Sequence, residues 1–323
     1  MSAMVKGVSI VIPTKNSGAV LDKCLASIAS QNYPKGEYEV IIVDGHSSDE
    51  TVEIAGRYGC TVVYEDEGTI GGARNVGVAY SKGAYIVFTD ADCVVAGDWL
   101  SNLVREFSDE TIASVGGPNT TPDDDTAFAR SVGAVLRFLS NPGPRYGFDA
   151  DKVGEIYHNP TCNSAYRRSI FEAAGGFNSR LITCDDEELD YRIRARGYTI
   201  LYTPDARVFH YRRPTWKSFM EMAYRYGIGR MQAIKLHWRT GKWYHFTPSV
   251  IIAVIAVLLV LSFTDFTYFW GAVALLIGGG VGISLMSLYL GVKTKLRSFL
   301  TYWALIAIWF WGYGVGMLRG LTK

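Results

Sequence analysis

Short apolar runs alternate with helical patterns over the first part of the chain. Four runs rich in β-branched residues predict strands over Val8–Pro13, Tyr38–Asp44, Cys60–Tyr64 and Ala84–Thr89. Residues with helical periodicity lie between them and predict helices over Val20–Ser30, Asp49–Tyr58 and Gly71–Tyr80. This alternation predicts an α/β fold with a mostly parallel sheet and helices on both of its faces.

The C-terminal part has a different pattern, because residues 246–323 hold only 6 of the 63 charged residues. Three apolar stretches lie there, over 246–263, 268–292 and 299–318. A helix needs about 20 apolar residues to cross the hydrocarbon core of a bilayer. We therefore predict a transmembrane domain of three helices over 246–323. The alternative is a buried helical hairpin of a soluble protein.

The charges around these stretches predict their orientation. The first loop, Thr264–Thr267, carries Asp265 and no basic residue, whereas the second loop carries Lys293, Lys295 and Arg297. Basic loops stay in the cytoplasm. We therefore expect an integral protein of the plasma membrane, with a cytosolic front domain and the C-terminus outside. The start of the chain has no apolar core of a secretory signal, which agrees with this orientation.

The composition of the front part excludes other classes of protein. Residues 246–323 take 5 of the 32 basic and 1 of the 31 acidic residues, which leaves 27 and 30 and a formal charge of −3. A general nucleic-acid-binding protein needs a basic surface, so we expect no nucleic-acid partner. The five cysteines form no CxxC pair and are typical of reduced, mostly buried thiols, with one disulfide as the alternative. They are Cys24, Cys60, Cys93, Cys162 and Cys184.

Polar clusters follow three of the four predicted strands. Ligands of such sheets bind outside the carboxyl ends of the strands. Two carboxylates one residue apart can hold a divalent cation together with phosphate oxygens, although a surface turn is an equal alternative for the pair alone. The clusters are Pro13-Thr14-Lys15-Asn16, Asp44-Gly45-His46-Ser47-Ser48-Asp49-Glu50-Thr51 and Asp90-Ala91-Asp92.

The order of these motifs resembles the nucleotide-sugar domain of family 2 glycosyltransferases. The matching segments are IPTKN, VDGHSSDET and GGARNVGVAYSKGAYIVFTDAD, then Gly175-Gly176-Phe177, and then Asp185–Arg192, which resembles the family's ED-x-DL-x-x-R segment. The resemblance covers about residues 6–235. It implies a cytosolic domain of the GT-A fold over 1–213, a GDP- or UDP-sugar as the donor, and Mg²⁺ or Mn²⁺ as the cofactor.

The resemblance also implies donor-binding roles. Asp44 corresponds to the aspartate that holds the base or the ribose. Many relatives have a second aspartate where this chain has Gly45, so the base specificity stays open. The implied set is Pro13 and Thr14 under the base, Asp44, Arg74 and Asn75 at the diphosphate, and Asp90 and Asp92 at the ribose and the metal.

Metal and catalytic roles follow in the same way. Asp92 is the implied metal ligand, with Asp90 and His210 as further ligands; a packed or surface histidine is the alternative for His210. An acceptor hydroxyl needs a positioned carboxylate to take its proton. Asp186 corresponds to the family's base and lies at a predicted helix start, whose dipole favours a charged carboxylate. Asp185 lies beside it on the acceptor side, and one-step displacement with this base inverts the anomeric centre.

Residues 214–245 connect the two parts. The stretch Ala206–Lys242 carries nine basic residues and one acidic residue, interleaved with aromatic residues such as Trp216. This mixture predicts an amphipathic helix in the headgroup plane, with a solvated basic helix as the alternative. Arg225 and Arg230 occupy the place of the QxxRW element of related polysaccharide synthases without matching it. They are candidates for holding a diphosphate or a lipid phosphate, and Trp216 is a candidate on the acceptor side.

The predicted function is an inverting, metal-dependent transfer of a hexose to a dolichol- or polyprenol-linked saccharide at the cytosolic membrane face, as in N-glycan precursor assembly. GDP-mannose is the first expectation for the donor and UDP-glucose the second, on resemblance alone. One alternative is direct transfer to polyprenyl or dolichyl phosphate. Another is a non-catalytic membrane protein that binds nucleotide sugars, against which the intact set Asp44, Asp90, Asp92 and Asp186 argues.

Overall fold

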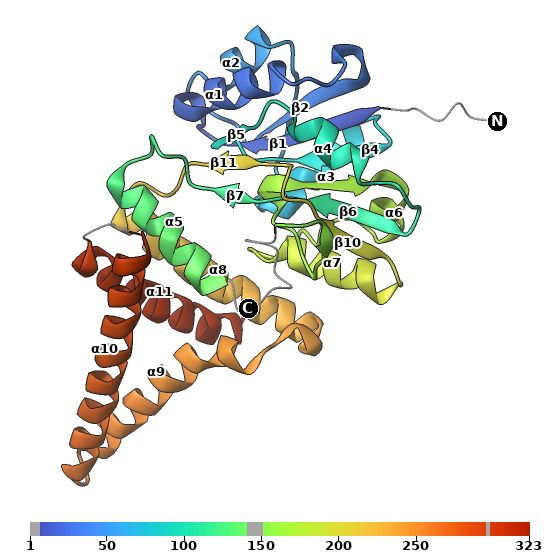
Figure 1. Ribbon diagram of the computed structural model, residues 1–323. Helices are drawn as coiled ribbons and strands as arrows, with labels where there is room; N and C mark the ends of the chain where they lie inside the picture. The colour runs from blue at the N-terminus through green and yellow to red at the C-terminus, as the bar shows by residue number, and fades with distance from the viewer. Residues whose placement is uncertain (1–6, 141–150, 295–297) are drawn as a thin grey trace. The chain divides into compact units, whose positions relative to one another are not determined.

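The computed structural model describes residues 7–140, 151–294 and 298–323, and the chain forms two units (Figure 1). The first unit runs to Pro122 and continues with the described residues up to Leu181 and with Asp185–Tyr211. The second unit comprises Asp123–Leu139, Ile182–Cys184 and Arg212–Lys323.

An eight-stranded sheet forms the centre of the first unit (Figure 1). Its strands follow the order β3-β2-β1-β4-β9-β6-β10-β8. Strand β1 pairs in parallel with β2 and β4, and β2 pairs in parallel with β3, so the four predicted strands are confirmed and lie together. The strands are β1 (Val8–Thr14), β2 (Tyr38–Asp44), β3 (Thr61–Tyr64), β4 (Tyr85–Phe88), β6 (Ile112–Gly116), β8 (Gly154–Glu155), β9 (Ser164–Arg167) and β10 (Thr199–Tyr202).

The other half of the sheet is mixed. Strand β9 is antiparallel to both of its neighbours, β4 and β6, while β10 is parallel to β6 and antiparallel to β8. A second sheet of three short strands has the order β5-β11-β7, with bounds Cys93–Val95, Val208–His210 and Asn119–Thr120. Because β5 and β11 are antiparallel, the loop after β4 lies next to the end of β11.

Helices cover both faces of the large sheet, as the alternation predicts. Neighbouring residues Ile10 and Val11 of β1 belong to opposite buried clusters, because successive side chains of a strand point to opposite faces. Helices α1 (Gly18–Ala29), α2 (Thr51–Arg57) and α4 (Trp99–Arg105) supply buried residues to one cluster. Helices α3 (Ile70–Tyr80), α6 (Arg168–Ala173) and α7 (Asp185–Ala195) supply buried residues to the other.

The described part of the second unit is helical. Three helices are long and apolar enough to cross a membrane, namely α9 (Trp243–Leu261), α10 (Thr267–Thr294) and α11 (Phe299–Gly320). The three apolar stretches predicted from the sequence are thus confirmed as helices. Two more helices, α5 (Ala127–Ser140) and α8 (Trp216–Leu236), belong to the same unit. Helix α8 begins with a capping box between Thr215 and Ser218, which satisfies backbone N–H groups at its start.

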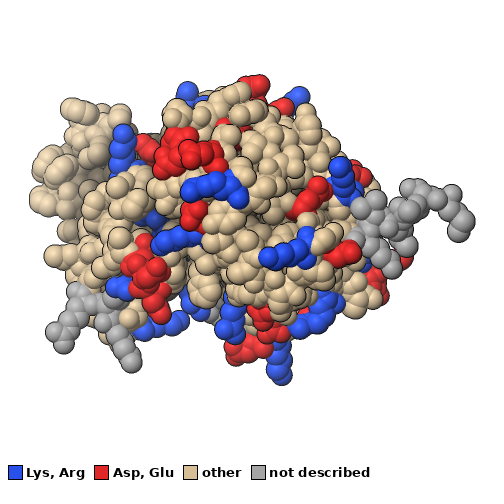
Figure 2. All heavy atoms as spheres, turned by 90° about the horizontal axis from the view of Figure 1, so that it is seen from above, with Lys and Arg blue, Asp and Glu red and all other residues tan. Residues whose placement is uncertain are grey.

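None of the five cysteines forms a disulfide in the structure, and the reduced state of the thiols stays a prediction. Four of them are buried and Cys60 is half-buried. Charged side chains of both signs are interspersed on the face of the molecule shown in Figure 2. With a formal net charge of +1, the chain gives no support for binding to a nucleic-acid backbone.

Candidate active site

The ends of β1 and β2 carry a carboxylate that organises the loop after β2. Asp44 is fully buried. It accepts a hydrogen bond from the Thr14 hydroxyl at 3.1 Å, and others from the backbone N–H and the hydroxyl of Ser47 at 2.8 and 2.6 Å. Three donors thus compensate for the buried charge. The structure brings Thr14 and Asp44 together, next to Pro13 in β1, and their contact with a base stays a prediction.

A second carboxylate lies beside Gly45. A Cβ added at Gly45 would lie 3.1 Å from Oε1 of Glu65, which directly follows β3. The other oxygen of Glu65 accepts the backbone N–H groups of Glu67 at 2.7 Å and of Gly68 at 3.2 Å, and these bonds fix the carboxylate. Glu65 therefore occupies the space into which a side chain at position 45 would extend. The sequence did not single it out, because it lies outside the motifs that carry the resemblance.

Arg74 is the buried cation of the site. Its side chain is only 3% exposed, and its terminal nitrogens donate to Asp90 at 3.0 Å and to Asp185 at 3.3 Å. Gly77, one turn further along α3, allows the helix to lie close to the sheet, because a Cβ there would overlap side chains of β1 and β2. Burial opposes the charge of Arg74, but the neighbouring carboxylates raise its pKa above the ordinary value. Arg74 thus connects the loop after β4 with the start of α7.

Asn75, the next residue, holds the loop after α6. Its Nδ2 donates to the carbonyl oxygen of Phe177 at 2.7 Å, and its Oδ1 accepts the N–H of Phe177 at 3.0 Å. Gly176 has a left-handed φ of 66°, and a Cβ there would lie 2.8 Å from Oδ1 of Asn75. Only glycine suits both conditions. These contacts make Asn75 a support of the loop, and its place at the diphosphate stays a prediction.

Asp92, Cys93 and His210 form a candidate metal centre. Nε2 of His210 lies 3.2 Å from Oδ1 of Asp92, and one ligand atom from each of the three residues lies within 4.8 Å of the others. Burial raises the pKa of the Cys93 thiol well above its usual value, which makes a thiolate ligand costly there. The carboxylate and the imidazole remain, and they fit a divalent cation that takes oxygen and nitrogen ligands. Asp90, the other predicted ligand, makes its hydrogen bond to Arg74 instead.

Asp185 begins helix α7 and is almost fully buried. Cys184 before it has a left-handed φ of 62°, which turns the chain into the helix. Burial raises the pKa of the Asp185 carboxyl to about 6, while the charge of Arg74 acts in the opposite direction. Because Asp185 is buried and bound to Arg74, it cannot take a proton from a substrate in this arrangement.

Asp186, the predicted base, is more accessible, with 20% of its side chain exposed. Its Oδ1 accepts the N–H of Glu187 at 2.8 Å. Its Oδ2 accepts the N–H and the hydroxyl of Thr161 at 3.3 and 3.4 Å. Thr161 begins the short helix η3 (Thr161–Asn163). These bonds orient the carboxylate at the start of α7.

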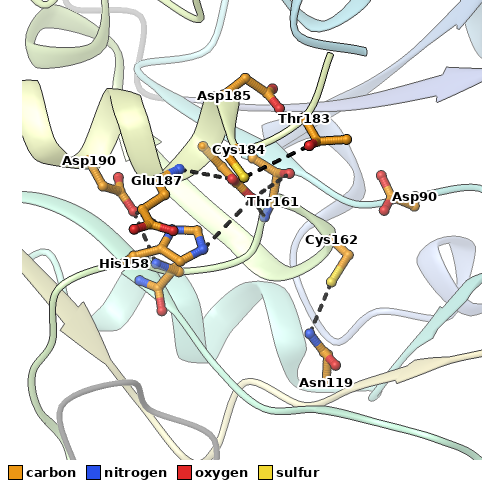
Figure 3. A network of polar contacts seen from close by, with 12 residues as sticks. Asp90, Asn119, His158, Thr161, Cys162, Thr183, Cys184, Asp185, Glu187 and Asp190 are labelled. Carbon is orange, nitrogen blue, oxygen red and sulfur yellow. Dashed lines mark hydrogen bonds and ion pairs between the residues drawn. The ribbon is translucent and has the colours of Figure 1, made fainter. Parts of the chain in front are cut away.

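A histidine that the sequence did not single out lies behind this carboxylate. Nδ1 of His158 lies 3.2 Å from Oδ2 of Asp190, and its Nε2 lies 3.9 Å from Oδ2 of Asp186 (Figure 3). Asp190 is fully buried and also accepts the Tyr166 hydroxyl at 2.9 Å and the N–H of Asn159 at 3.0 Å. Burial opposes a charge on His158, but Asp186 and Asp190 outweigh it and raise its pKa to about 9. His158 is therefore an imidazolium at neutral pH.

Three further predicted residues belong to helix α8 of the second unit. Trp216 is 44% exposed, Arg225 is exposed and Arg230 is half-buried. Their roles at the acceptor or at a phosphate stay predictions.

The chain is similar in sequence to known proteins. The model of Glycosyl transferase family 2 matches residues 9–175. Glycosyltransferase AglE of Haloferax volcanii is 31% identical over 241 residues, which cover 72% of this chain and 75% of AglE. The O-antigen chain rhamnosyltransferase RfbN of Salmonella typhimurium is 30% identical over 210 residues, which cover 63% of this chain and 66% of RfbN. The chain belongs to glycosyl transferase family 2 and is a glycosyltransferase.

A solved structure agrees with the fold. The mannosyltransferase PcManGT from Pyrobaculum calidifontis, in complex with GDP-Man and Mn²⁺, superposes with a TM-score of 0.63 at 21% identity. The match covers 94% of this chain and 87% of that one. The predicted fold class is thus confirmed: a mixed α/β domain of the GT-A type, followed by C-terminal helices of which three are candidate membrane spans.

Proposed function

We propose that this glycosyltransferase moves a hexose, with inversion, from a nucleotide-diphosphate sugar to a lipid-linked saccharide at the cytosolic face of the plasma membrane, with a divalent cation as cofactor. One observation carries the proposal. Arg74 bonds both to Asp90 of the Asp90-Ala91-Asp92 motif and to Asp185, the neighbour of Asp186. The donor-binding loop and the candidate base therefore belong to one site.

GDP-mannose is the donor that we favour, with UDP-glucose second. The likeness to a mannosyltransferase solved with GDP-Man supports this choice. The carboxylate of Glu65 beside Gly45 supports it as well. Guanine presents a ring N–H and an amino group along one edge, whereas uracil presents a single N–H, and carboxylate oxygens accept such groups. Asp44, buried among its own donors, would hold the loop under the base.

The cation would be held by Asp92 and His210, with Asp90 close by in the same loop. Mg²⁺ and Mn²⁺ both suit the carboxylate of Asp92, and the imidazole of His210 suits Mn²⁺ better than Mg²⁺; the likeness to a protein solved with Mn²⁺ supports a cation here. When bound, such an ion neutralises negative charge that develops on the leaving diphosphate. The guanidinium of Arg74 adds a fixed positive charge, and its buried Nε–H has no hydrogen-bond partner among the described residues.

Asp186 is the base of this mechanism. It takes the proton of the acceptor hydroxyl while that oxygen attacks the anomeric carbon, and the nucleoside diphosphate leaves from the opposite face. Such a base contributes about 10²–10⁴-fold to a rate. Asp185 is engaged by Arg74, Glu188 by Arg192 and Asp190 by His158, whereas Asp186 keeps 20% of its side chain exposed to an acceptor.

The acceptor is a dolichol- or polyprenol-linked saccharide, as in the assembly of N-glycan precursors.

The proposed domains are a catalytic domain over 1–213, an interface segment over 214–245 and a membrane domain over 246–323. Exposed aromatic residues next to basic ones, such as Trp238 beside Arg239, suit the headgroup region. The loop between α9 and α10 carries Asp265 and no basic residue, which supports a cytosolic catalytic domain. The side of the C-terminus depends on whether α11 crosses the membrane.

Purified protein in detergent, given radiolabelled GDP-mannose or UDP-glucose with a membrane lipid extract and Mn²⁺, tests the proposal. We expect label from GDP-mannose in a lipid product that carries more than one sugar. A product with a single sugar on polyprenyl phosphate would instead favour direct transfer to the lipid phosphate, where Arg225 and Arg230 would hold the acceptor. No transfer from either donor, with lipid and cation present, would contradict the proposal.

A further inference from the structure

Helix α11 packs along helix α8 with the two backbones in close contact. The contacts are made at glycines that recur every fourth residue along α11. Their partner residues on α8 also follow one another in the direction of increasing residue number. A Cβ added at Gly316 would overlap the carbonyl oxygen of Tyr224. The two helices therefore run side by side in the same direction. The contact points are Gly312 with Ala223, Gly316 with Tyr224 and Gly227, and Gly320 with Ile228 and Met231.

Helix α8 carries charges along its whole length, and a charged side chain in the hydrocarbon core is costly. Four of its charged residues are exposed and Arg230 is half-buried. A helix of this composition lies at the membrane surface rather than in the core. The charged residues are Lys217, Glu221, Arg225, Arg230 and Lys235. Because α11 is packed along α8, it is held at the same depth.

Residues of the first half of α11 share a buried apolar cluster with residues of α5. Tyr302, Leu305 and Ile306 are buried in one cluster with Val132 and Val135 of α5. Helix α5 has basic residues of its own, Arg130 and Arg137. At the other end of α11, Nζ of Lys235 lies 3.5 and 3.3 Å from the carbonyl oxygens of Gly320 and Leu321. The first half of α11 thus shares a buried cluster with a helix that carries basic residues, and its end accepts hydrogen bonds from Lys235 of α8.

Helices α9 and α10 differ from α11 in both composition and surroundings. The most apolar stretches of α9 and α10 have mean hydropathies of 2.2 and 2.0, whereas that of α11 has 1.3. The buried share of these stretches is 17% in α9, 11% in α10 and 33% in α11. The first half of α9 contacts α11, since a Cβ at Gly314 would meet Pro248 and Ile252, and the rest of the α9–α10 hairpin extends away from the α8–α11 pair (Figure 1). With 28 residues, α10 is about 42 Å long and exceeds the ~30 Å hydrocarbon core. Helix α11 is instead rich in Trp and Tyr, which favour the membrane–water interface.

We propose that only the α9–α10 hairpin crosses the membrane. Helices α8 and α11, together with α5, form a platform in the headgroup region of the bilayer, and Lys323 lies on the same side as the start of α8. Arg319 and Lys323 then lie on the cytosolic side, where basic residues accumulate, if the catalytic domain is cytosolic. The expectation of an outside C-terminus came from hydropathy, which does not register that one face of α11 is covered by charged helices.

Protease protection of the full chain tests this topology. One variant carries an epitope tag after Lys323, and another carries the tag between Thr264 and Asp265 at the tip of the hairpin. In sealed inside-out vesicles we expect protease to remove the C-terminal tag together with the catalytic domain and to spare the tag at the tip. A C-terminal tag that is cleaved from the same side as the tip overturns the proposal. The comparison holds for either orientation of the catalytic domain, so it is independent of the proposed function.

A matched pair of glycine variants tests the packing on which the topology depends. Gly316→Leu places a side chain against the backbone of α8, whereas a Cβ at Gly279 of α10 meets nothing within 4 Å. We expect Gly316→Leu to lower the melting temperature in detergent by roughly 5 °C or more, and Gly279→Leu to leave it unchanged. Equal melting temperatures of the two variants would overturn the proposal, because α11 would then not be held along α8.

Discussion

His158 makes the stability of the catalytic unit depend on pH in a direction that the structure fixes. Its imidazolium lies between Asp190, which is fully buried, and Asp186. His158→Gln removes the charge but keeps a side chain that can donate a hydrogen bond to Asp190. The variant therefore separates the effect of the charge from that of the hydrogen bond.

The magnitude follows from the pKa of His158. It is about 9 in the folded protein, against about 6.5 for an unperturbed histidine. Because the folded state binds this proton more tightly, the stabilisation is fully present below about pH 6.5 and is lost as the pH rises through about 9. A difference of about 2.5 pKa units corresponds to roughly 3 kcal/mol. With 17% of the side chain exposed, solvent screening reduces this value only in part.

Thermal unfolding of the purified protein between pH 6 and pH 10 measures the effect. We expect the melting temperature of the wild type to exceed that of His158→Gln by roughly 5–10 °C near pH 6.5, and the difference to shrink toward zero near pH 10. His46→Gln is the control, since His46 pairs with Asp66 at the surface, where such pairs contribute little. A difference in melting temperature between the wild type and His158→Gln that stays constant from pH 6 to pH 10 would show that the charge of His158 does not stabilise the fold.

Two substitutions test the donor site. Asp92→Ala should abolish transfer and the cation-dependent part of donor binding, which titration with Mn²⁺ measures. The control Asp98→Ala, at the start of α4, should leave both unchanged. Near-normal turnover of wild-type enzyme treated with a chelator would contradict the metal role of Asp92. Glu65→Gln should raise the KM for GDP-mannose roughly tenfold with little change in kcat, because one charged hydrogen-bond acceptor is lost. Glu67→Gln, two residues further on, is its control, and an equal effect of both changes would refute a role of Glu65 at the base.

The parallel half of the sheet could be predicted because its signals are local. Each of β1 to β4 is a short apolar run, and each is followed by a helical pattern or by a polar cluster. The position of β9 could not be predicted in the same way. It lies between β4 and β6 although it is more than 70 residues beyond β4 in the chain, and nothing local specifies such pairing. Helix α5 was also missed, although it packs with the C-terminal helices.

The candidate site shows the same limit. Asp92 and His210 were each singled out by a motif, and the structure brings them to 3.2 Å through the pairing of β5 with β11. His158 has no motif of its own. The spacing of four residues between Asp186 and Asp190 indicates a shared face of α7, but the partner of that face comes from a distant segment. Motifs identify the residues that meet substrates more readily than those that support them.

The rate of the Asp186→Asn variant shows whether Asp186 is the base of the transfer. Asparagine keeps the size of the side chain and its ability to accept hydrogen bonds at the helix start, but it cannot take a proton. With a lipid-linked saccharide as the acceptor, we expect a loss of roughly 10²-fold or more in kcat and little change in donor affinity. The control variant Glu187→Gln should stay close to wild type. An Asp186→Asn enzyme that retains most of its activity, and whose product is a single sugar on polyprenyl phosphate, would contradict both the role of Asp186 as the base and a saccharide as the acceptor.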